Sequence, residues 1–331
     1  MYYCKKCILP STRPNLEIDS NGVCNACKTS SSSNKKLINW REKEEEFKSL
    51  LTRNITNNSW DCVIPVSGGK DSTWQVLTAL KYNLKPLCIT WKTPARNSLG
   101  VSNLQNLISL GVDHIEFTVN PKVEKHFTKL AFIKKGIPLI PMHLAIYNLP
   151  IRIANNLNIP LVFYGENSAV EYGGDPKYHN YEITREWILK FGVNANTTAE
   201  DWISEDLSEK DLIPYTYPKN IINPPKAVFL SNFFEWNVFI TRDIAIKHGL
   251  KVPNSPQTGI HNFSDIDDEF LVGIHHWLKW YKFGFKRTWD NLSLEIREGK
   301  LNRKQAIDLL INTENSKKEN EQIEKFCDYL E

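Results

Sequence analysis

The chain has 331 residues, of which 41% are hydrophobic and 24% charged, and its formal net charge is +3. These values are typical of a globular protein with one large or two modest domains and a sizeable core. The small charge argues against a general nucleic-acid-binding surface and against a nucleic-acid partner. No apolar run approaches the roughly 20 residues of a membrane helix, and the N-terminus lacks a signal-peptide apolar segment. We therefore expect a cytoplasmic protein with no membrane partner.

Four of the seven cysteines form two closely spaced pairs near the N-terminus. The pairs are Cys4-x-x-Cys7 and Cys24-x-x-Cys27, which is the spacing of a structural zinc ribbon. Disulfides explain the pattern less well in a cytosolic chain, and an iron–sulfur cluster is the remaining alternative. The pattern therefore predicts Zn²⁺ bound by Cys4, Cys7, Cys24 and Cys27. Four thiolates close the coordination sphere, so we expect a structural role.

A Ser-rich linker over residues 29–34 follows the cysteine pairs, and a charged helix is predicted over 35–53 with Leu37, Trp40 and Phe47 on its apolar face. From residue 61, short apolar runs alternate with helical patterns. Strands are predicted at 62–66, 86–91, 114–119 and 160–164, with a candidate last strand at 224–230. Helices are predicted at 71–82, 98–110 and 123–156. This alternation predicts an α/β fold with a parallel sheet flanked by helices on both faces.

The first strand of this series leads into the stretch Ser67-Gly-Gly-Lys-Asp-Ser-Thr73. A strand, a Gly-rich turn and a helix N-terminus together bind phosphate, because unpaired N–H groups and the helix dipole point at one spot. Gly68 and Gly69 allow close backbone approach and positive φ. Further polar groups come from Ser67, Lys70, Ser72 and Thr73.

This stretch is not a Walker A loop, because its two glycines are adjacent and Asp71 directly follows Lys70. The string S-G-G-x-D-S instead resembles the PP-loop of ATP pyrophosphatases, which cleave ATP into AMP and pyrophosphate. An ordinary strand-to-helix turn is the alternative interpretation of two glycines alone. The whole string after an apolar strand favours a nucleotide site.

Ligands of parallel sheets bind beyond the carboxyl ends of the strands. The loop should therefore share one edge with Trp91 and with Gly165-Glu-Asn167. Trp91 is a candidate to flank adenine, with burial in the core as the alternative. Glu166 is a candidate carboxylate near Mg²⁺ or the reacting substrate, with a polar loop cap as the alternative.

The alternation breaks after residue 175, and we expect an insertion or lid beside the site at about 175–220, with a helical stretch over 198–212. A helix is predicted at 243–249. Ser264-Asp-Ile-Asp267 predicts a capping box for a helix reaching residue 281, so the acids there should complement the helix dipole rather than bind metal. His275 and His276 are expected to be packing or surface groups. Further helices are predicted at 287–297, 303–312 and 319–330.

The sequence predicts three domains. Residues 1–34 form a zinc-binding knuckle and linker, residues 35–250 a PP-loop domain that contains the insertion, and residues 251–331 a helical C-terminal region.

Taken together, the cysteine pairs and the PP-loop resemble the N-acetyl sugar amidotransferase family, a branch of the PP-loop ATP pyrophosphatase superfamily. This family is associated with pseudaminic acid and with amidino sugars of the O-antigen of lipopolysaccharide. The matching stretches are Tyr3–Pro14, Gly22–Cys27, Ile64–Ser72, Tyr164–Asn167 and Tyr281–Phe285. Residues 231–235 and 286–289 depart from the family pattern.

The resemblance implies ATP-dependent conversion of an acetamido group into an acetamidino group. AMP is transferred to the amide oxygen, pyrophosphate is released, and ammonia displaces AMP. It implies Lys70, Asp71 and Glu166 as catalytic residues, with Asp71 linked to Mg²⁺ and with Glu166 and Asn167 contacting the acetamido sugar. ATP contacts fall on Ser67, Gly68, Gly69, Lys70, Asp71, Ser72, Thr73, Trp91 and Gly165.

Ammonia must come from elsewhere under this hypothesis, because Cys62, Cys88 and Cys327 do not resemble a glutaminase nucleophile with a partnered His. We expect a separate glutaminase subunit or free ammonia. tRNA thiolation by a PP-loop enzyme is the alternative function, but such enzymes need reactive cysteines, and +3 is a small charge for tRNA. A non-catalytic nucleotide- or glycan-binding module is a third reading, which the intact loop argues against.

Overall fold

The computed structural model describes residues 1–30, 38–55, 59–219, 223–312 and 316–331. Most of the predicted linker, residues 31–34, and Leu37 of the predicted first helix lie outside the described residues. Within the described ranges, we find no helix whose length and apolar character would let it cross a bilayer.

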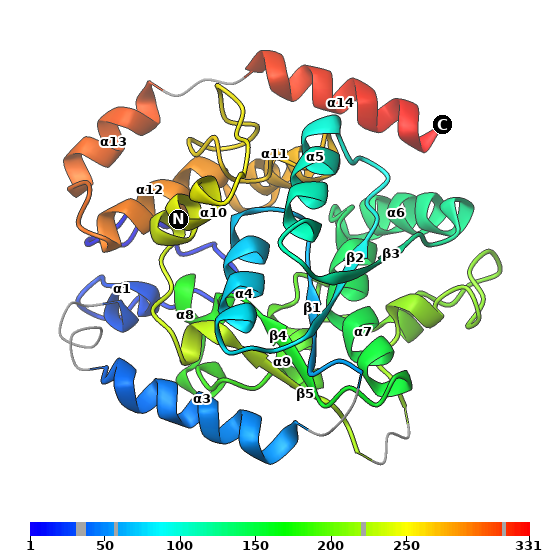
Figure 1. The fold of residues 1–331 in the computed structure, drawn as a ribbon. Coiled ribbons are helices and arrows are strands. Elements are labelled where there is room, and N and C mark those ends of the chain that lie inside the picture. The colour runs from blue at the N-terminus through cyan, green and yellow to red at the C-terminus, as the bar shows by residue number, and fades with distance from the viewer. Residues whose placement is uncertain (31–37, 56–58, 220–222, 313–315) are drawn as a thin grey trace.

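Five parallel strands form the central sheet, in the order β3-β2-β1-β4-β5 (Figure 1). They are β1 Cys62–Pro65, β2 Pro86–Trp91, β3 Asp113–Phe117, β4 Leu161–Tyr164 and β5 Lys226–Phe229. The first strand lies in the middle, where Val63 is opposite Leu87 of β2 and Val162 of β4. The predicted α/β fold with a parallel sheet is confirmed, and the candidate last strand is the edge strand β5.

Alternate residues of each strand enter two separate cores, because successive side chains point to opposite faces of a sheet. Val63 packs in one core, whereas Cys62 and Ile64 pack in the other. The first core is covered by α6 Pro121–Lys135, α7 Ile140–Asn156 and α9 Arg185–Phe191. The second is covered by α3 Trp40–Asn54, α4 Lys70–Lys81, α5 Ser98–Ile108 and α10 Val238–Lys247. Both faces are thus apolar, as a parallel sheet requires.

The segment predicted as an insertion or lid packs on the first core instead of covering the site. Its short elements are η1 Pro176–Tyr178, α9, η2 Ala199–Trp202 and η3 Ile213–Tyr215. Trp187, Trp202 and Tyr215 are buried there. The helix predicted over 198–212 is wrong beyond Trp202, because the side chains of Ser208 and Asp211 bond to local backbone and to each other.

The C-terminal region contains α11 Leu271–Phe283, α12 Arg287–Arg297, α13 Arg303–Ile311 and α14 Ser316–Leu330. In Figure 1, α12 and α13 lie beside the blue N-terminal segment, which ends in α1 Asn25–Thr29. The short elements α8 Ser168–Glu171 and η4 Leu230–Asn232 follow β4 and β5. The proposed domain limits stay a prediction.

The capping box predicted at Ser264 is wrong, because α11 begins only at Leu271. Asp265 has φ of 56°, a left-handed conformation that interrupts any helix there. One acid does complement the helix start: Asp268 Oδ1 accepts hydrogen bonds from the N–H groups of Phe270 and Val272, both at 3.0 Å. His275 and His276, which were expected to be packing or surface groups, are partly buried on α11, and burial lowers the pKa of His276 to about 4.

Candidate functional site

The loop between β1 and α4 has the backbone of a phosphate cradle. Gly68 has φ of 91°, and a Cβ at this position would lie 2.5 Å from the backbone N of Leu104 in α5. Gly69 is the N-cap of α4 and makes no side-chain capping bond. The hydroxyl of Ser72 accepts a hydrogen bond from the N–H of Ser67 at 3.0 Å, which closes the turn. The N–H groups of the first turn of α4 are therefore oriented for an anion.

Two charged side chains of opposite sign stand at the start of α4. Lys70 Nζ contacts the Asp71 carboxylate, and Lys70 is only 9% exposed. The other carboxylate oxygen, Asp71 Oδ1, accepts from Trp236 Nε1 and from Thr241 Oγ1, both at 3.3 Å. Burial lowers the pKa of Lys70, but the charges of Asp71 and Glu166 outweigh burial and raise it. Lys70 is thus held as a cation inside the site.

Glu166 follows the carboxyl end of β4 and is close enough to Lys70 and Asp71 for their charges to shift its pKa. Burial, followed by the nearby charge of Asp71, raises the pKa of Glu166 to about 7, against the opposing effect of Lys70. The preceding Gly165 gives room to a neighbour, because a Cβ there would lie 2.6 Å from Gln75 Nε2 of α4. A carboxyl group with this pKa exchanges a proton near neutral pH.

These groups line one cavity of about 420 Å³ at the carboxyl ends of the strands, a size typical of small-ligand sites. One wall comes from the sheet and α4 and includes the PP-loop, Trp91 and Glu166. A second wall comes from the C-terminal region and includes His261, Asp265 and Arg287. Hereafter these are the PP-loop wall and the C-terminal wall.

The C-terminal wall is held by buried charge pairs. Arg287 Nε lies 3.5 Å from Asp265 Oδ2, and His276 Nε2 lies 3.6 Å from the same oxygen. Burial raises the pKa of Asp265, but the charge of Arg287 and the bond to His276 outweigh it, so that the pKa falls well below its usual range. The ion pair with Arg287 is therefore present at neutral pH.

Most of the predicted site residues meet at the cavity. Those that line it are Ser67, Gly69, Lys70, Asp71, Ser72, Trp91, Gly165 and Glu166. Trp91 belongs at the same time to the hydrophobic core, and its Nε1 is buried without a partner among the described residues. Trp91 is therefore part of the core and also borders the cavity, and its contact with adenine stays a prediction.

Three predicted residues have structural positions instead. Gly68 shapes the loop but does not line the cavity. Thr73 is 1% exposed and its hydroxyl donates to the carbonyl of Gly69 at 3.0 Å. Asn167 is also 1% exposed; its oxygen caps α8 through Ala169 N–H, and its amide nitrogen donates to two backbone carbonyls. These donors and acceptors are used within the fold, and a contact of Asn167 with the substrate stays a prediction.

Several residues that line the cavity were not predicted from the sequence, notably Arg96, Trp236, His261 and Arg287. Arg96 Nη1 donates to the carbonyl of Ser67 at 3.2 Å, and its Nε is buried without a partner among the described residues. A position just after β2 was an available signal for Arg96, as was the position after β5 for Trp236. Nothing local in the sequence pointed to His261 or Arg287.

The four N-terminal cysteines are buried and their Sγ atoms lie within 4.8 Å of one another. Cys7 Sγ and Cys24 Sγ are 3.8 Å apart, close to the sulfur spacing of a tetrahedron with bonds of about 2.3 Å to zinc. Backbone N–H groups of Lys6 and Cys7 donate to Cys4 Sγ at 3.4 Å. The donor set and spacing therefore fit a structural Zn²⁺ ion.

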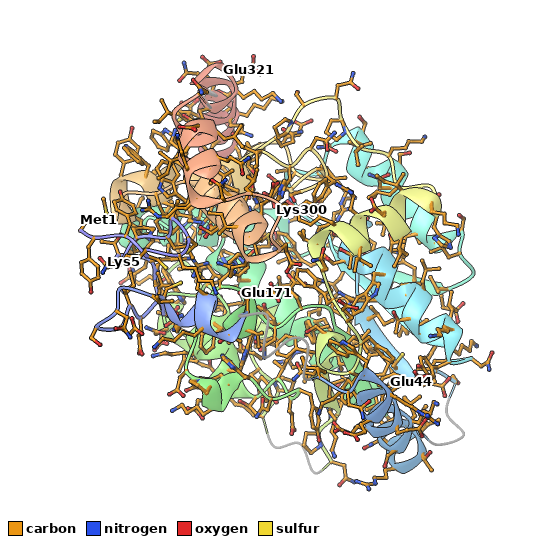
Figure 2. All side chains as sticks on the ribbon, turned by 90° about the vertical axis from the view of Figure 1, so that its left-hand side faces the viewer. Met1, Lys5, Glu44, Glu171, Lys300 and Glu321 are labelled. Carbon is orange, nitrogen blue, oxygen red and sulfur yellow. The ribbon has the colours of Figure 1, made fainter. Side chains whose placement is uncertain are left out.

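The cysteine knuckle is joined to the C-terminal region and to the cavity. Arg303 Nε donates to the Cys7 carbonyl at 3.1 Å. Arg13 Nε lies 3.0 Å from the buried Asp290 of α12, and its guanidinium lies 4.9 Å from the ring centre of Tyr172, a cavity residue. Arg297 donates to the Glu171 carbonyl at 2.8 Å. Figure 2 views the molecule from this side and labels Lys5 of the knuckle, Glu171 and Lys300.

Comparisons with solved structures give 30 similar chains, and two of them are each 14% identical to this chain with a TM-score of 0.33. NMN synthetase from Francisella tularensis is matched over 80% of this chain and 94% of its own. A predicted subunit of tRNA methyltransferase from Methanocaldococcus jannaschii is matched over 70% of this chain and 91% of its own. Likenesses this weak carry no argument about function. No curated protein matches the chain.

One family model does match, over residues 258–331, and it describes the C-terminal domain of WbpG-like LPS biosynthesis proteins. The matched residues include the C-terminal wall of the cavity. The match agrees with the resemblance to surface-glycan biosynthesis enzymes that the sequence indicated. Residues 258–331 of this chain are thus similar to the C-terminal domain of WbpG-like proteins.

Proposed function

We propose that the chain is an ATP-dependent amidotransferase that converts an acetamido group of a bacterial surface sugar into an acetamidino group. The observation that carries this proposal is the shared cavity. A PP-loop that suits ATP forms one wall, and a WbpG-like LPS biosynthesis domain forms the other. A nucleotide and a sugar precursor bound in one cavity are the reactants that such a reaction needs.

In the first half-reaction, the amide oxygen of the acetamido group attacks the α-phosphorus of ATP. A P–O bond forms to the amide oxygen, and pyrophosphate leaves. The first-turn N–H groups of α4 and the Lys70 cation bind the phosphates as charge moves to the leaving group. Trp91 borders the space that would take adenine. The amide N–H loses its proton, and Glu166, with a pKa of about 7, is positioned to accept it.

Mg²⁺ is expected to accompany ATP. The charge of Asp71 acts on Glu166, and both residues line the cavity next to the phosphate loop. Carboxylate oxygens are suitable ligands for this ion. Asp71 would hold Mg²⁺, with Glu166 beside it, and the ion would neutralise phosphate charge. Cys4, Cys7, Cys24 and Cys27 would hold a structural Zn²⁺ ion, because four thiolates leave no open coordination position.

In the second half-reaction, ammonia attacks the carbon of the adenylated amide and AMP leaves. None of the seven cysteines suits a built-in glutaminase: four belong to the knuckle, Cys62 and Cys88 are fully buried in strands, and Cys327 lies on α14. We therefore include a separate glutaminase subunit or free ammonia as the nitrogen source. An ATP-consuming step on a sugar precursor also fits a cytoplasmic location.

The alternative function, tRNA thiolation, needs a reactive thiol near the adenylated base. No cysteine lines the cavity in the part of the chain that the structure describes. Burial raises the pKa of Cys62 and Cys88 above that of a free thiol, which disfavours the nucleophilic thiolate. These observations favour sugar amidation over thiolation.

The test is incubation of the purified protein with ATP, Mg²⁺ and ammonium chloride. A panel of free and UDP-linked acetamido hexoses, including UDP-N-acetylglucosamine, supplies the second substrate. We expect AMP and pyrophosphate to form only when a suitable acetamido sugar is present. Release of ADP and phosphate instead would contradict the PP-loop mechanism. ATP cleavage that needs no sugar and that unmodified tRNA stimulates more than any sugar would favour tRNA thiolation.

A further inference from the structure

A buried His–Glu pair lies in the C-terminal wall of the cavity. His261 lines the cavity and is 5% exposed. Its Nε2 lies 2.8 Å from Oε1 of Glu295, a residue of α12. The other ring nitrogen, Nδ1, is buried and has no hydrogen-bond partner among the described residues. Because Nε2 is held by Glu295, Nδ1 is the nitrogen left for a ligand.

Aromatic rings fix the orientation of His261. Its ring stacks on Phe263 at a centroid distance of 4.8 Å and an interplanar angle of 14°. Phe239 of α10 packs edge-on against it at 5.5 Å. Val238, the residue before Phe239, lines the same cavity, as does Trp236, which donates to Asp71. His261 is therefore next to the segment that borders the Asp71 site.

Among the described residues, one carboxylate contacts this ring, and two cations lie over its aromatic neighbours. Glu295 faces Nε2 directly. The guanidinium of Arg242 lies over Phe263 and Phe239 rather than against the imidazole, and the ammonium of Lys300 lies over Phe239. A carboxylate bound to one imidazole nitrogen fixes the tautomer and stabilises the imidazolium when the other nitrogen gains a proton.

The first half-reaction releases the amide proton, for which Glu166 of the PP-loop wall accounts. In the second, the attacking ammonia nitrogen must lose a proton as the C–N bond forms. We propose that His261 accepts the second proton, from the attacking ammonia, at Nδ1, and that Glu295 positions the His261 ring for this transfer. This assignment rests on the proposed function and adds a proton acceptor from the C-terminal wall.

The step balances as follows. Ammonia forms a C–N bond to the carbon of the O-adenylyl imidate. One of its protons passes to Nδ1 of His261, and another ends on the former amide nitrogen. The C–O bond to AMP breaks, and AMP leaves with the electron pair. The product is the amidine, a strong base, and the proton on His261 then passes to the amidine or to solvent.

The experiment separates the two half-reactions. Sugar-dependent exchange of labelled pyrophosphate into ATP, measured without ammonia, reports adenylation. Amidine formation, measured with ammonium chloride, reports both halves. The substrate is whichever sugar of the acetamido hexose panel gives the highest exchange with the wild-type protein. His261→Asn is expected to keep exchange within about twofold and to lower amidine formation about 100-fold, the scale of lost general base catalysis.

Two further variants complete the test. Glu295→Gln keeps a hydrogen-bond acceptor for Nε2–H but removes the charge, so amidine formation should fall about tenfold with exchange unchanged. If His261→Asn does not fold, the Glu295→Gln variant tests the proposal by itself. His248→Asn is the matched control, because the His248 ring bonds its own helix at Ile244 and does not line the cavity. It should leave both activities unchanged.

Wild-type amidine formation in folded His261→Asn would overturn the assignment. Equal loss of exchange and amidine formation in both His261→Asn and Glu295→Gln would overturn it as well, since the pair would then act in binding. Absence of sugar-dependent exchange in the wild-type protein is a different outcome, because it removes the proposed function itself and this assignment with it.

Discussion

The two walls of the cavity differ in how the chain builds them. The PP-loop, which forms most of the PP-loop wall, is local: Ser67 to Ser72 lie on one loop and the first turn of one helix. Trp91 and Glu166 join it from the ends of β2 and β4. The C-terminal wall is assembled from parts that are distant in the chain, because its Arg287 pairs with Asp265. The helix α12 that carries Arg287 also pairs through Asp290 with Arg13 of the knuckle. A local motif can be recognised from sequence, whereas an assembled wall depends on the packing of the whole chain. The two walls should therefore respond differently to substitution.

The largest expected effect is on the PP-loop wall. Asp71→Ala should lower the rate of ATP cleavage to AMP by about 10² to 10³-fold, because it removes the carboxylate that we assign to Mg²⁺ and the partner of Lys70. The measurement is steady-state AMP release. Asp243→Ala on the exposed side of α10 is the control and should be fully active. An active Asp71→Ala protein would contradict the assigned role.

The next effect is on the knuckle. We expect about one Zn²⁺ per chain, and Cys4→Ser should lose it and lower the melting temperature by about 10 °C, because metal binding contributes directly to folding. Metal analysis and thermal unfolding measure the two quantities. Cys327→Ser removes an exposed thiol outside the knuckle and should change neither. A folded wild-type protein without metal would show that the zinc interpretation is wrong.

A smaller effect is predicted where the knuckle meets the C-terminal wall. Arg13→Ala should reduce the free energy of unfolding by about 2 kcal/mol, because Asp290 stays buried and loses one of two charged partners. The second partner, Lys279, remains at 2.5 Å. Urea unfolding measures the change, and the exposed Arg53→Ala should differ from wild type by less than about 0.5 kcal/mol. Equal stability of the two variants would mean that the Arg13 contact contributes little.

The smallest predicted effect is a pH dependence of the PP-loop wall. Below its pKa of about 7, Glu166 is protonated and cannot accept the amide proton. The value of kcat/KM for ATP should therefore fall by about tenfold per pH unit below 7 and level off above it. Glu166→Gln should be slow and lack this limb. Glu186→Gln, an exposed control, should keep it. A flat wild-type profile through this range would exclude Glu166 as the proton acceptor.

The difference between the walls also explains which features the sequence predicted. Strands β1, β2 and β4 were recognisable because both of their faces are buried, which makes each of them a short apolar run. The PP-loop and its geometry followed from adjacent residues. The capping of α8 by Asn167 could not be predicted, because its position after β4 does not reveal where its amide bonds. His261 and Glu295 are 34 residues apart and carry no shared pattern, so only the fold brings them together. The false capping box at Ser264 failed for a related reason, since Asp265 is held by Arg287 in a left-handed conformation.

The central claim is that both walls serve one reaction, the conversion of an acetamido group into an acetamidino group. Mass spectrometry of the acetamido hexose panel after reaction with ATP and ¹⁵N-labelled ammonium tests it most directly. The account predicts a sugar product in which one oxygen is replaced by ¹⁵NH, formed together with equal amounts of AMP and pyrophosphate. Sugars that remain unlabelled while ATP is cleaved would contradict the account.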